Sequence, residues 1–247
     1  MIACEHIDCR DEGGVLTLSL NRTEKKNALT GDMYRALTSA LHEAATDDSI
    51  RVVLITAEGN YFCAGNDLHG FKAIADIPYQ ERPGFNFMNS LATFPKPVVA
   101  ALPGDAVGIG VTLLLHCDLV YLSQDSRLRL PFVNIGLVPE FASTTLLIQR
   151  IGYQRAAELL FLQQQLDANA ALALGLANKV LPADVLLATA MDTCRALTLQ
   201  SSAALQHTKR LMKQPELPAI INKIEQETLA INELLGSIKL PDNSNNH

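Results

Sequence analysis

The sequence contains no tryptophan, and aromatic residues make up only 5% of its 247 residues. Glycine and proline are also modest, at 14 and 11 residues, which argues against collagen-like repeats and against disorder. Hydrophobic residues make up 48% of the chain and are spread along its length, so a sizeable buried core is expected. The length fits one domain of about 200 residues with a smaller appendage.

The chain also lacks a basic run, a long apolar run and a leader-like start. Its net charge is −6, and binding to nucleic acid depends on clustered cations, so no nucleic-acid partner is expected. The longest uncharged stretch near the middle of the chain runs from Ala106 to Cys117, with histidine counted as neutral. This stretch is far shorter than the ~20 apolar residues of a membrane span. Met1 to Arg10 has no apolar core like that of a secretion signal. These features predict a cytoplasmic protein without a membrane span.

Five cysteines are present, and no two of them form a C-x-x-C pair. An odd, scattered set is typical of reduced thiols and argues against a disulfide framework. Cys4, His6 and Cys9 are soft metal ligands in principle, and they lie on what is expected to be the first strand. Because no second ligand pair follows elsewhere, no metal site is predicted.

Several common catalytic signatures are missing. Gly104, Gly108 and Gly110 are spaced G-x-x-x-G-x-G, which is not the dinucleotide fingerprint, and no phosphate-binding G-x-x-x-x-G-K-[ST] loop occurs. His42-Glu43 lacks the second histidine of the zinc-protease motif, and no serine lies in a G-x-S-x-G elbow. A dehydrogenase, an ATPase, a zinc protease and an α/β-hydrolase therefore lose support.

Apolar runs and helical periodicities alternate through most of the chain, and this order predicts an α/β fold. After Pro182 only helical patterns remain. We therefore divide the chain into a core at 1–195 and a C-terminal helical section at 196–247, with a frayed tail at 241–247. The predicted elements are strands 15–20, 51–56, 97–102, 119–122 and 179–181, a helix capped by Thr30, a buried helix in the second half of 104–116, a helix at 168–174 between Asp167 and Gly175, and helices 184–199, 203–213 and 218–235.

Three loops at predicted strand ends, with two further segments, resemble the crotonase (enoyl-CoA hydratase/isomerase) superfamily. One such loop alone is a weak signal, but five in this order are specific and cover nearly the whole chain. The segments are Asn21-Arg22-x-Glu24-Lys25-Lys26-Asn27-Ala28-Leu29, Tyr61-Phe62-Cys63-Ala64-Gly65-Asn66-Asp67-Leu68, Phe94-Pro95-Lys96-Pro97-Val98-Val99-Ala100 with Ala106-Val107-Gly108-Ile109-Gly110, Leu130-Pro131-Phe132 with Gly136-Leu137-Val138-Pro139-Glu140, and Ala170 followed by Gly175-Leu176-Ala177-Asn178-Lys179-Val180.

The resemblance implies a crotonase-like spiral of repeated ββα units with a C-terminal helical trimerisation section, assembled as a homotrimer or a hexamer. It implies an acyl-CoA substrate and no separate cofactor, since coenzyme A is part of the substrate. The residues implied in substrate binding are Lys26, Ala28, Ala64, Gly65, Asn66, Asp67, Leu68, Gly108, Ile109 and Phe132.

Family members stabilise an enolate with two backbone N–H groups, which here correspond to Asn66 and Ile109. A glycine-rich entry to a helix at Gly108 suits such an oxyanion hole, because the first N–H groups of a helix lack intrahelical partners. The alternative is that Gly65, Gly104, Gly108 and Gly110 only mark turns and close helix–sheet contacts. Lys25 and Lys26 are equally compatible with contacts to the CoA nucleotide and with a solvated surface.

The acidic residues indicate the reaction. At the positions of the two glutamates of hydratases this sequence has Thr112 and Phe132, neither of which exchanges a proton as a carboxylate does. A carboxylate follows instead at Glu140. Together, the loop at 64–68, the segment at 107–114 and Pro139-Glu140 with Ser143 resemble the peroxisomal-type Δ3,Δ2-enoyl-CoA isomerases, in which this Glu is the single base. Asn66, Ile109 and Glu140 are thus the predicted catalytic residues, although an arbitrary loop glutamate is usually just exposed.

Three matters stay open from the sequence. Other acyl-CoA chemistry of the superfamily, such as a thioesterase, a lyase or a hydratase-like reaction, and a non-catalytic CoA-binding scaffold are alternatives. Asp67 is expected to cap a following helix, and His69, His116 and His207 are expected to be structural. The residues around the acyl tail are expected within Phe71 to Phe94, a stretch that shows no code for chain length.

Overall fold

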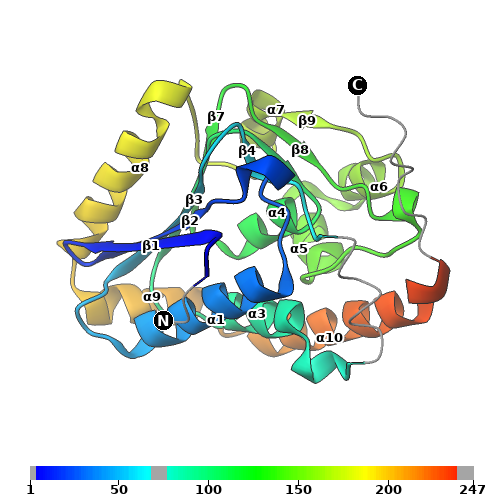
Figure 1. Cartoon of the computed structure of the whole chain (residues 1–247), viewed down its shortest axis with the longest axis horizontal. Helices are drawn as coiled ribbons and strands as arrows, with labels where there is room; N and C mark the ends of the chain where they lie inside the picture. The colour runs from blue at the N-terminus through cyan, green and yellow to red at the C-terminus, as the bar shows by residue number, and fades with distance from the viewer. Residues whose placement is uncertain (1–3, 68–76, 238–247) are drawn as a thin grey trace.

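The computed structural model describes residues 4–67 and 77–237. Three successive ββα units form the body of the molecule, and each unit sends its first strand to a large sheet and its second strand to a small one (Figure 1). The strand pairs are β3 with β4, β5 with β6, and β7 with β8, followed by α3, α4 and α5 respectively. This architecture confirms the predicted α/β, crotonase-like fold class.

The helices and strands have the following bounds. The strands are β1 Ile7–Glu12, β2 Val15–Leu20, β3 Val52–Ala57, β4 Tyr61–Cys63, β5 Val98–Leu102, β6 Asp105–Val107, β7 Leu119–Ser123, β8 Arg127–Arg129, β9 Leu166–Asp167 and β10 Lys179–Leu181. The helices are α1 Gly31–Thr46, α3 Pro83–Ala92, α4 Ile109–Thr112, α5 Ser143–Ile151, α6 Tyr153–Phe161, α7 Ala168–Ala173, α8 Ala183–Thr198, α9 Ser202–Lys213 and α10 Leu217–Leu234.

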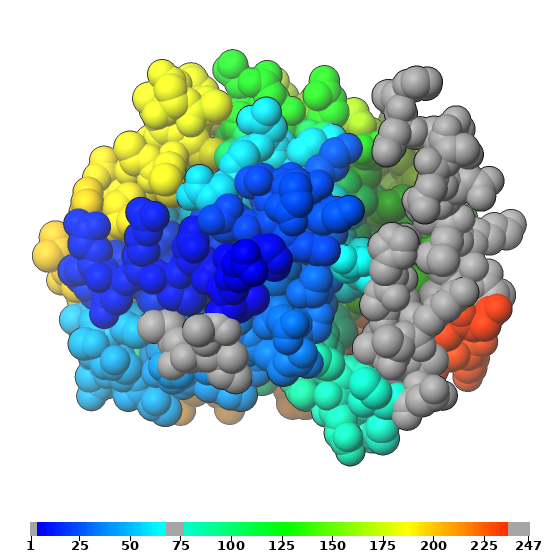
Figure 2. Space-filling view, in the orientation of Figure 1, coloured from blue at the N-terminus to red at the C-terminus, as the bar shows by residue number. Residues whose placement is uncertain are grey.

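The large sheet has the order β1-β2-β3-β5-β7-β10, with β1 antiparallel to β2 and every later pair parallel. All residues of β3 and β5 are buried, because both faces of the sheet are covered. One face packs against α8 through Leu186, Ala190 and Cys194. The other face packs on the main core, which includes the apolar side of α1. In Figure 2, the N-terminal hairpin in dark blue lies beside the yellow α8 on the surface.

The small sheet has the order β4-β6-β8-β9, in which β4, β6 and β8 are parallel. The turn between β5 and β6 lies against the turn between β3 and β4. A Cβ atom on Gly104 would lie 1.9 Å from the Asn60 carbonyl oxygen, so only glycine fits there. Close stacking of the successive turns therefore depends on this residue.

The predicted elements agree with the structure to within a residue or two, and two predicted caps are confirmed. The Thr30 hydroxyl accepts from the Met33 amide, and the Asp167 carboxylate accepts from the Ala170 amide. The predicted first strand begins only at Ile7, so Cys9 lies on β1 while Cys4 and His6 precede it. Helices α3, α5 and α6 and the short strands of the small sheet were not predicted.

The C-terminal helices have different neighbours. Helix α8 packs on the large sheet and runs unbroken through the predicted boundary at 195, whereas α10 contacts α3 (Figure 1). The predicted tail at 241–247 lies outside the described residues. No helix within 4–67 and 77–237 is long and apolar enough to cross a membrane.

Candidate active site

The loop after β4 carries the first predicted oxyanion donor. The Leu29 amide donates to the Gly65 carbonyl at 2.8 Å, and the Asp67 amide donates to the Leu29 carbonyl at 2.9 Å. In this parallel bridge the N–H and C=O of Asn66 point away from Leu29. No acceptor in the described parts of the chain pairs with the Asn66 amide. The turn needs Gly65, whose φ of 101° is in the region that favours glycine.

The second donor lies at the start of α4. Gly108 has φ 55° and ψ −119°, so the chain turns sharply there and Ile109 becomes the first residue of the helix. Its amide, like other first-turn amides, has no intrahelical acceptor, and none occurs elsewhere among residues 4–67 and 77–237. A Cβ atom on Gly110 would lie 2.8 Å from Cys63, so α4 approaches the end of β4 closely. This close approach brings the two donor loops together.

Glu140 is the carboxylate that meets these loops. Glu140 is only 7% exposed, which rules out the alternative of an exposed loop glutamate. The Asn66 side-chain amide donates to Oε1 of Glu140 at 2.9 Å, and the Tyr34 hydroxyl donates to Oδ1 of Asn66 at 2.5 Å. Burial raises the pKa of Glu140 to about 7, against the opposing effect of the Asn66 hydrogen bond and with an added contribution from Glu227.

Two cavities meet at these residues. Asn66, Ile109, Glu140 and Ile231 line both of them. The Tyr34 cavity, of about 400 Å³, is further lined by Leu29, Thr30, Gly31, Tyr34, Arg35, Asp67, Ile77, Arg82, Pro83, Gly84, Phe85, Met88 and Thr228. The Phe132 cavity, of about 270 Å³, is further lined by Ala64, Gly65, Val107, Gly108, Pro131, Phe132, Asn134, Ile135 and Leu137.

The turn after Glu140 has an unusual backbone. Phe141 and Ala142 have φ values of 66° and 56°, so two consecutive residues with side chains are in the left-handed region. His116 donates through Nε2 to the Phe141 carbonyl at 2.8 Å, and its ring stacks on the Phe141 ring at 3.9 Å. Burial lowers the pKa of His116 to about 3, so the ring is neutral, in line with the predicted structural role.

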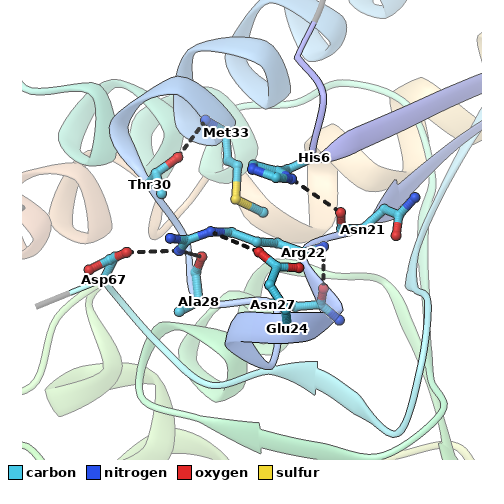
Figure 3. A network of polar contacts seen from close by, with 9 residues as sticks. All are labelled: His6, Asn21, Arg22, Glu24, Asn27, Ala28, Thr30, Met33 and Asp67. Carbon is cyan, nitrogen blue, oxygen red and sulfur yellow. Dashed lines mark hydrogen bonds and ion pairs between the residues drawn. The ribbon is translucent and has the colours of Figure 1, made fainter.

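A polar network joins the segment 22–28 to the first donor loop (Figure 3). Arg22 donates through Nη1 to Asp67 at 2.7 Å and to the Ala28 carbonyl at 3.1 Å. The Asn27 side chain accepts from the Arg22 amide at 2.7 Å, and the Ala64 amide donates to the Lys26 carbonyl at 2.9 Å. These contacts fix the position of the loop that carries Asn66.

The remaining predicted binding residues fall into three groups. Ala64, Gly65, Gly108 and Phe132 line the Phe132 cavity, and Asp67 lines the Tyr34 cavity. Lys26 and Ala28 line neither of these cavities; the Lys26 side chain is exposed, with its ammonium 4.9 Å from the Tyr61 ring centroid. Leu68, His69 and any helix capped by Asp67 lie outside the described residues.

Sequence reasoning missed Tyr34 and Glu227. Tyr34 lies on the buried face of α1, where a hydroxyl needs a partner, and this need is the one signal that the sequence held. Glu227 lies on α10 and is 5% exposed. It lies among polar neighbours in the sequence and is indistinguishable there from a solvated helix residue. In the described residues no group of three or more His, Cys, Asp or Glu side chains is placed to hold a metal ion.

The described residues form a spiral of ββα units in which two amides without an acceptor among those residues lie beside a buried carboxylate, as the resemblance to acyl-CoA enzymes predicts. The model of the enoyl-CoA hydratase/isomerase family matches residues 10–237, and the chain belongs to this family. Its fold matches the structure of Pseudomonas aeruginosa OdaA with a TM-score of 0.91 at 42% identity, over 94% of each chain.

Two relatives point to different reactions. The chain is 39% identical to enoyl-CoA delta isomerase 2 of Rattus norvegicus, over 69% of this chain and 45% of that protein, so it spans about half of the relative's length. It is 34% identical to 2,3-dehydroadipyl-CoA hydratase of Escherichia coli, over 86% of this chain and 84% of that protein. Family membership therefore leaves the reaction to be argued from the site.

Proposed function

We propose that the protein converts 3-enoyl-CoA to trans-2-enoyl-CoA with Glu140 as its single base. The observation that carries this proposal is a buried carboxyl with a pKa near 7 at the junction of two cavities, beside the unpaired amides of Asn66 and Ile109. A general base with a pKa close to the working pH suits the removal of a proton from carbon. The similarity to a delta isomerase agrees with this chemistry.

The reaction is a proton transfer from C2 to C4. Glu140 removes a proton from C2, and the C–H electrons move into the thioester, so that negative charge develops on its oxygen. The amides of Asn66 and Ile109 stabilise this dienolate, and removal of one such donor typically costs ~3 kcal/mol of transition-state stabilisation. The same carboxyl, now protonated, returns the proton to C4, and the double bond moves between C2 and C3.

The Asn66 side chain determines which carboxylate oxygen is the base. Its amide donates to Oε1 of Glu140, which leaves Oε2 to accept the substrate proton. We assign the acyl tail to the Tyr34 cavity, because Phe85 and Met88 give it apolar walls that the Phe132 cavity does not share. Part of the predicted tail segment, 77–94, contributes to this wall, and the rest lies outside the described residues.

Hydration is the main alternative, and the similarity to a hydratase motivates it. Hydratases of the family use two glutamates, and Thr112 and Phe132 occupy those positions here. Both are buried, and neither acts as an acid or a base at neutral pH. We therefore expect crotonyl-CoA to be hydrated negligibly, and rapid formation of 3-hydroxyacyl-CoA would contradict the isomerase proposal.

Assembly as a trimer or a hexamer is part of the proposal. Large apolar side chains are exposed on α6 and α9, where Phe161 is 62% exposed and Met212 is 77% exposed. Such surfaces suit burial against another subunit. A monomer in sedimentation equilibrium at micromolar concentration would contradict this assembly.

The decisive assay uses 3-enoyl-CoA substrates of several chain lengths and follows conjugation by absorbance. Glu140→Gln keeps the shape of the side chain but cannot accept the proton, so the rate should collapse while acyl-CoA binding persists. The matched control is Glu233→Gln on the exposed side of α10. In D2O, a single carboxyl should return part of the substrate's own hydrogen to C4. Near-native turnover by Glu140→Gln would refute the assignment of the base.

A further inference from the structure

The Glu227 carboxylate is fully engaged with the turn that follows Glu140. Its Oε2 accepts from the Ala142 amide at 2.6 Å, and its Oε1 accepts from the amide and the hydroxyl of Thr144 at 3.0 and 2.6 Å. The two partners lie 85 and 83 residues earlier in the chain. The carboxylate therefore joins the last long helix to the start of α5.

This contact replaces a missing helix cap. Helix α5 begins at Ser143 after Ala142, whose methyl side chain cannot accept a hydrogen bond from the first-turn amides. Ala142 and Phe141 are also in the left-handed region, which is unfavourable for residues with side chains. A turn of this kind persists only where its surroundings hold it, and Glu227 binds one side of it while His116 binds the Phe141 carbonyl.

The same turn sets the direction of the catalytic carboxyl. Glu140 directly precedes Phe141, and the Ser143 amide donates back to the Glu140 carbonyl at 3.3 Å. A relaxed turn would rotate the Glu140 backbone and move its carboxyl away from Asn66. Helix α10 also supplies Thr228 and Ile231 to the wall of the Tyr34 cavity. One helix thus contacts both the cavity and the turn of the base.

We infer that Glu227 is a positioning residue for Glu140, holding the 140–142 turn so that the base faces the amides of Asn66 and Ile109. The inference rests on the proposed function only in taking Glu140 as the base. Burial raises the pKa of Glu227 to about 7, against the lowering effects of its hydrogen bonds from Thr144 and Ala142 and of Lys223 on its own helix. The charge of Glu227 in turn raises the pKa of Glu140. The facing His116 is neutral.

The test is Glu227→Gln, compared with the exposed Glu233→Gln on the same helix. Glutamine keeps the size but has one acceptor oxygen, so it cannot bind both amides as the carboxylate does. We expect kcat to fall between ~10-fold and ~100-fold with KM nearly unchanged, as for a misplaced catalytic group. The inflection of the pH–rate profile should also move to higher pH, because the displaced carboxyl loses the Asn66 hydrogen bond, which affects its pKa more than the Glu227 charge does. Glu233→Gln should change neither quantity.

A second variant guards against misfolding. Thr144→Val removes only the hydroxyl that donates to Glu227, and a kcat lower by ~3-fold or more is expected. An unchanged kcat and pH profile in folded Glu227→Gln would overturn the inference. If circular dichroism shows that this variant does not fold, an unchanged kcat in Thr144→Val would overturn it.

Exchange of the C2 proton of a saturated acyl-CoA in D2O separates this inference from the proposed reaction. If the native protein exchanges that proton without isomerising 3-enoyl-CoA, the isomerase proposal fails, and slower exchange in Glu227→Gln still supports the positioning role. Equal exchange in both proteins would overturn that role. The absence of both reactions in the native protein would remove Glu140 as the base and overturn the inference with it.

Discussion

The Asn66 side-chain amide donates to Glu140, while the Asn66 backbone N–H, which has no partner among the described residues, is one of the two proposed oxyanion donors. One residue therefore relates the position of the base to the position of the developing negative charge. The Tyr34 hydroxyl fixes the orientation of that side chain, since it donates to Oδ1 and leaves Nδ2 for the carboxylate. The proposed catalytic geometry thus depends on three hydrogen-bonded side chains, which come from α1, the loop after β4 and the loop before α5.

The pH dependence of kcat/KM should follow the ionisation of Glu140. Its pKa is raised to about 7, and only the ionised form accepts a proton, so kcat/KM should rise with pH and level off above an inflection near 7. Glu227 has a similar pKa, and the inflection belongs to the interacting pair. A rate that is flat from pH 5 to pH 8 would contradict the raised pKa.

Ionisation of Glu140 should lower the stability of the folded protein as the pH rises, whereas it should raise the rate. A carboxyl whose pKa is raised on folding binds its proton more tightly in the folded state, so its stabilising contribution is complete below about pH 4.5 and is lost as the pH rises through about 7. The melting temperature of Glu140→Gln, compared with that of the native protein, should therefore show the larger relative gain above pH 7.

Asn66→Ala should weaken catalysis without removing the backbone donor at that position. Loss of the hydrogen bond to Glu140 removes an interaction that favours the charged carboxylate, so the inflection should move above pH 7. We expect kcat to fall ~10-fold, since hydrogen bonds to charged groups are worth more than neutral ones. A pH–rate titration of this variant gives both numbers, and an inflection shifted to lower pH would contradict the assignment.

Tyr34→Phe removes only the hydroxyl that orients Asn66. Without it the Asn66 amide is free to turn its oxygen toward Glu140, so we expect a ~2-fold to ~10-fold lower kcat. The exposed Tyr153→Phe on α6 is the matched control and should behave as the native protein does. Steady-state kinetics of the two variants side by side would show whether the phenol at position 34 contributes beyond packing.

Ile109→Pro tests the second donor. Proline lacks the N–H and is tolerated in the first turn of a helix, so the fold should survive while kcat falls ~100-fold or more. Ile109→Val keeps the N–H and separates the contribution of the side chain. Unchanged turnover in a folded proline variant would remove this amide from the site.

Prediction from the sequence succeeded where local chemistry was sufficient. The strand at Val15–Leu20 and the Thr30 cap follow from alternation and from a side chain next to the helix that it caps. Helices α5 and α6 lack a side-chain cap at their first residues, so no start signal marks them. Strands of three residues, such as β4 and β6, are too short to show a period.

The candidate site also combines residues that a local sequence motif marks with residues that no local motif marks. Ordered loop motifs predicted Asn66, Ile109 and Glu140 as catalytic residues, and in the structure all three line the same two cavities. Tyr34 and Glu227 reach the site only through tertiary packing. Tyr34 binds Asn66, which is 32 positions away in the sequence, and Glu227 binds Ala142, which is 85 positions away. No local pattern reports a contact over such separations, and Glu227 in particular has the composition of an ordinary surface residue around it.

The contact between Glu227 and Ala142 also has a consequence for the order in which a working molecule is made. A ribosome completes both donor loops and the turn of the base long before it reaches α10. Until that helix docks, the left-handed residues after Glu140 lack the carboxylate that holds them. A nascent chain would acquire the two oxyanion amides first and its oriented base last, so catalytic competence would begin at one late event in synthesis rather than grow with chain length.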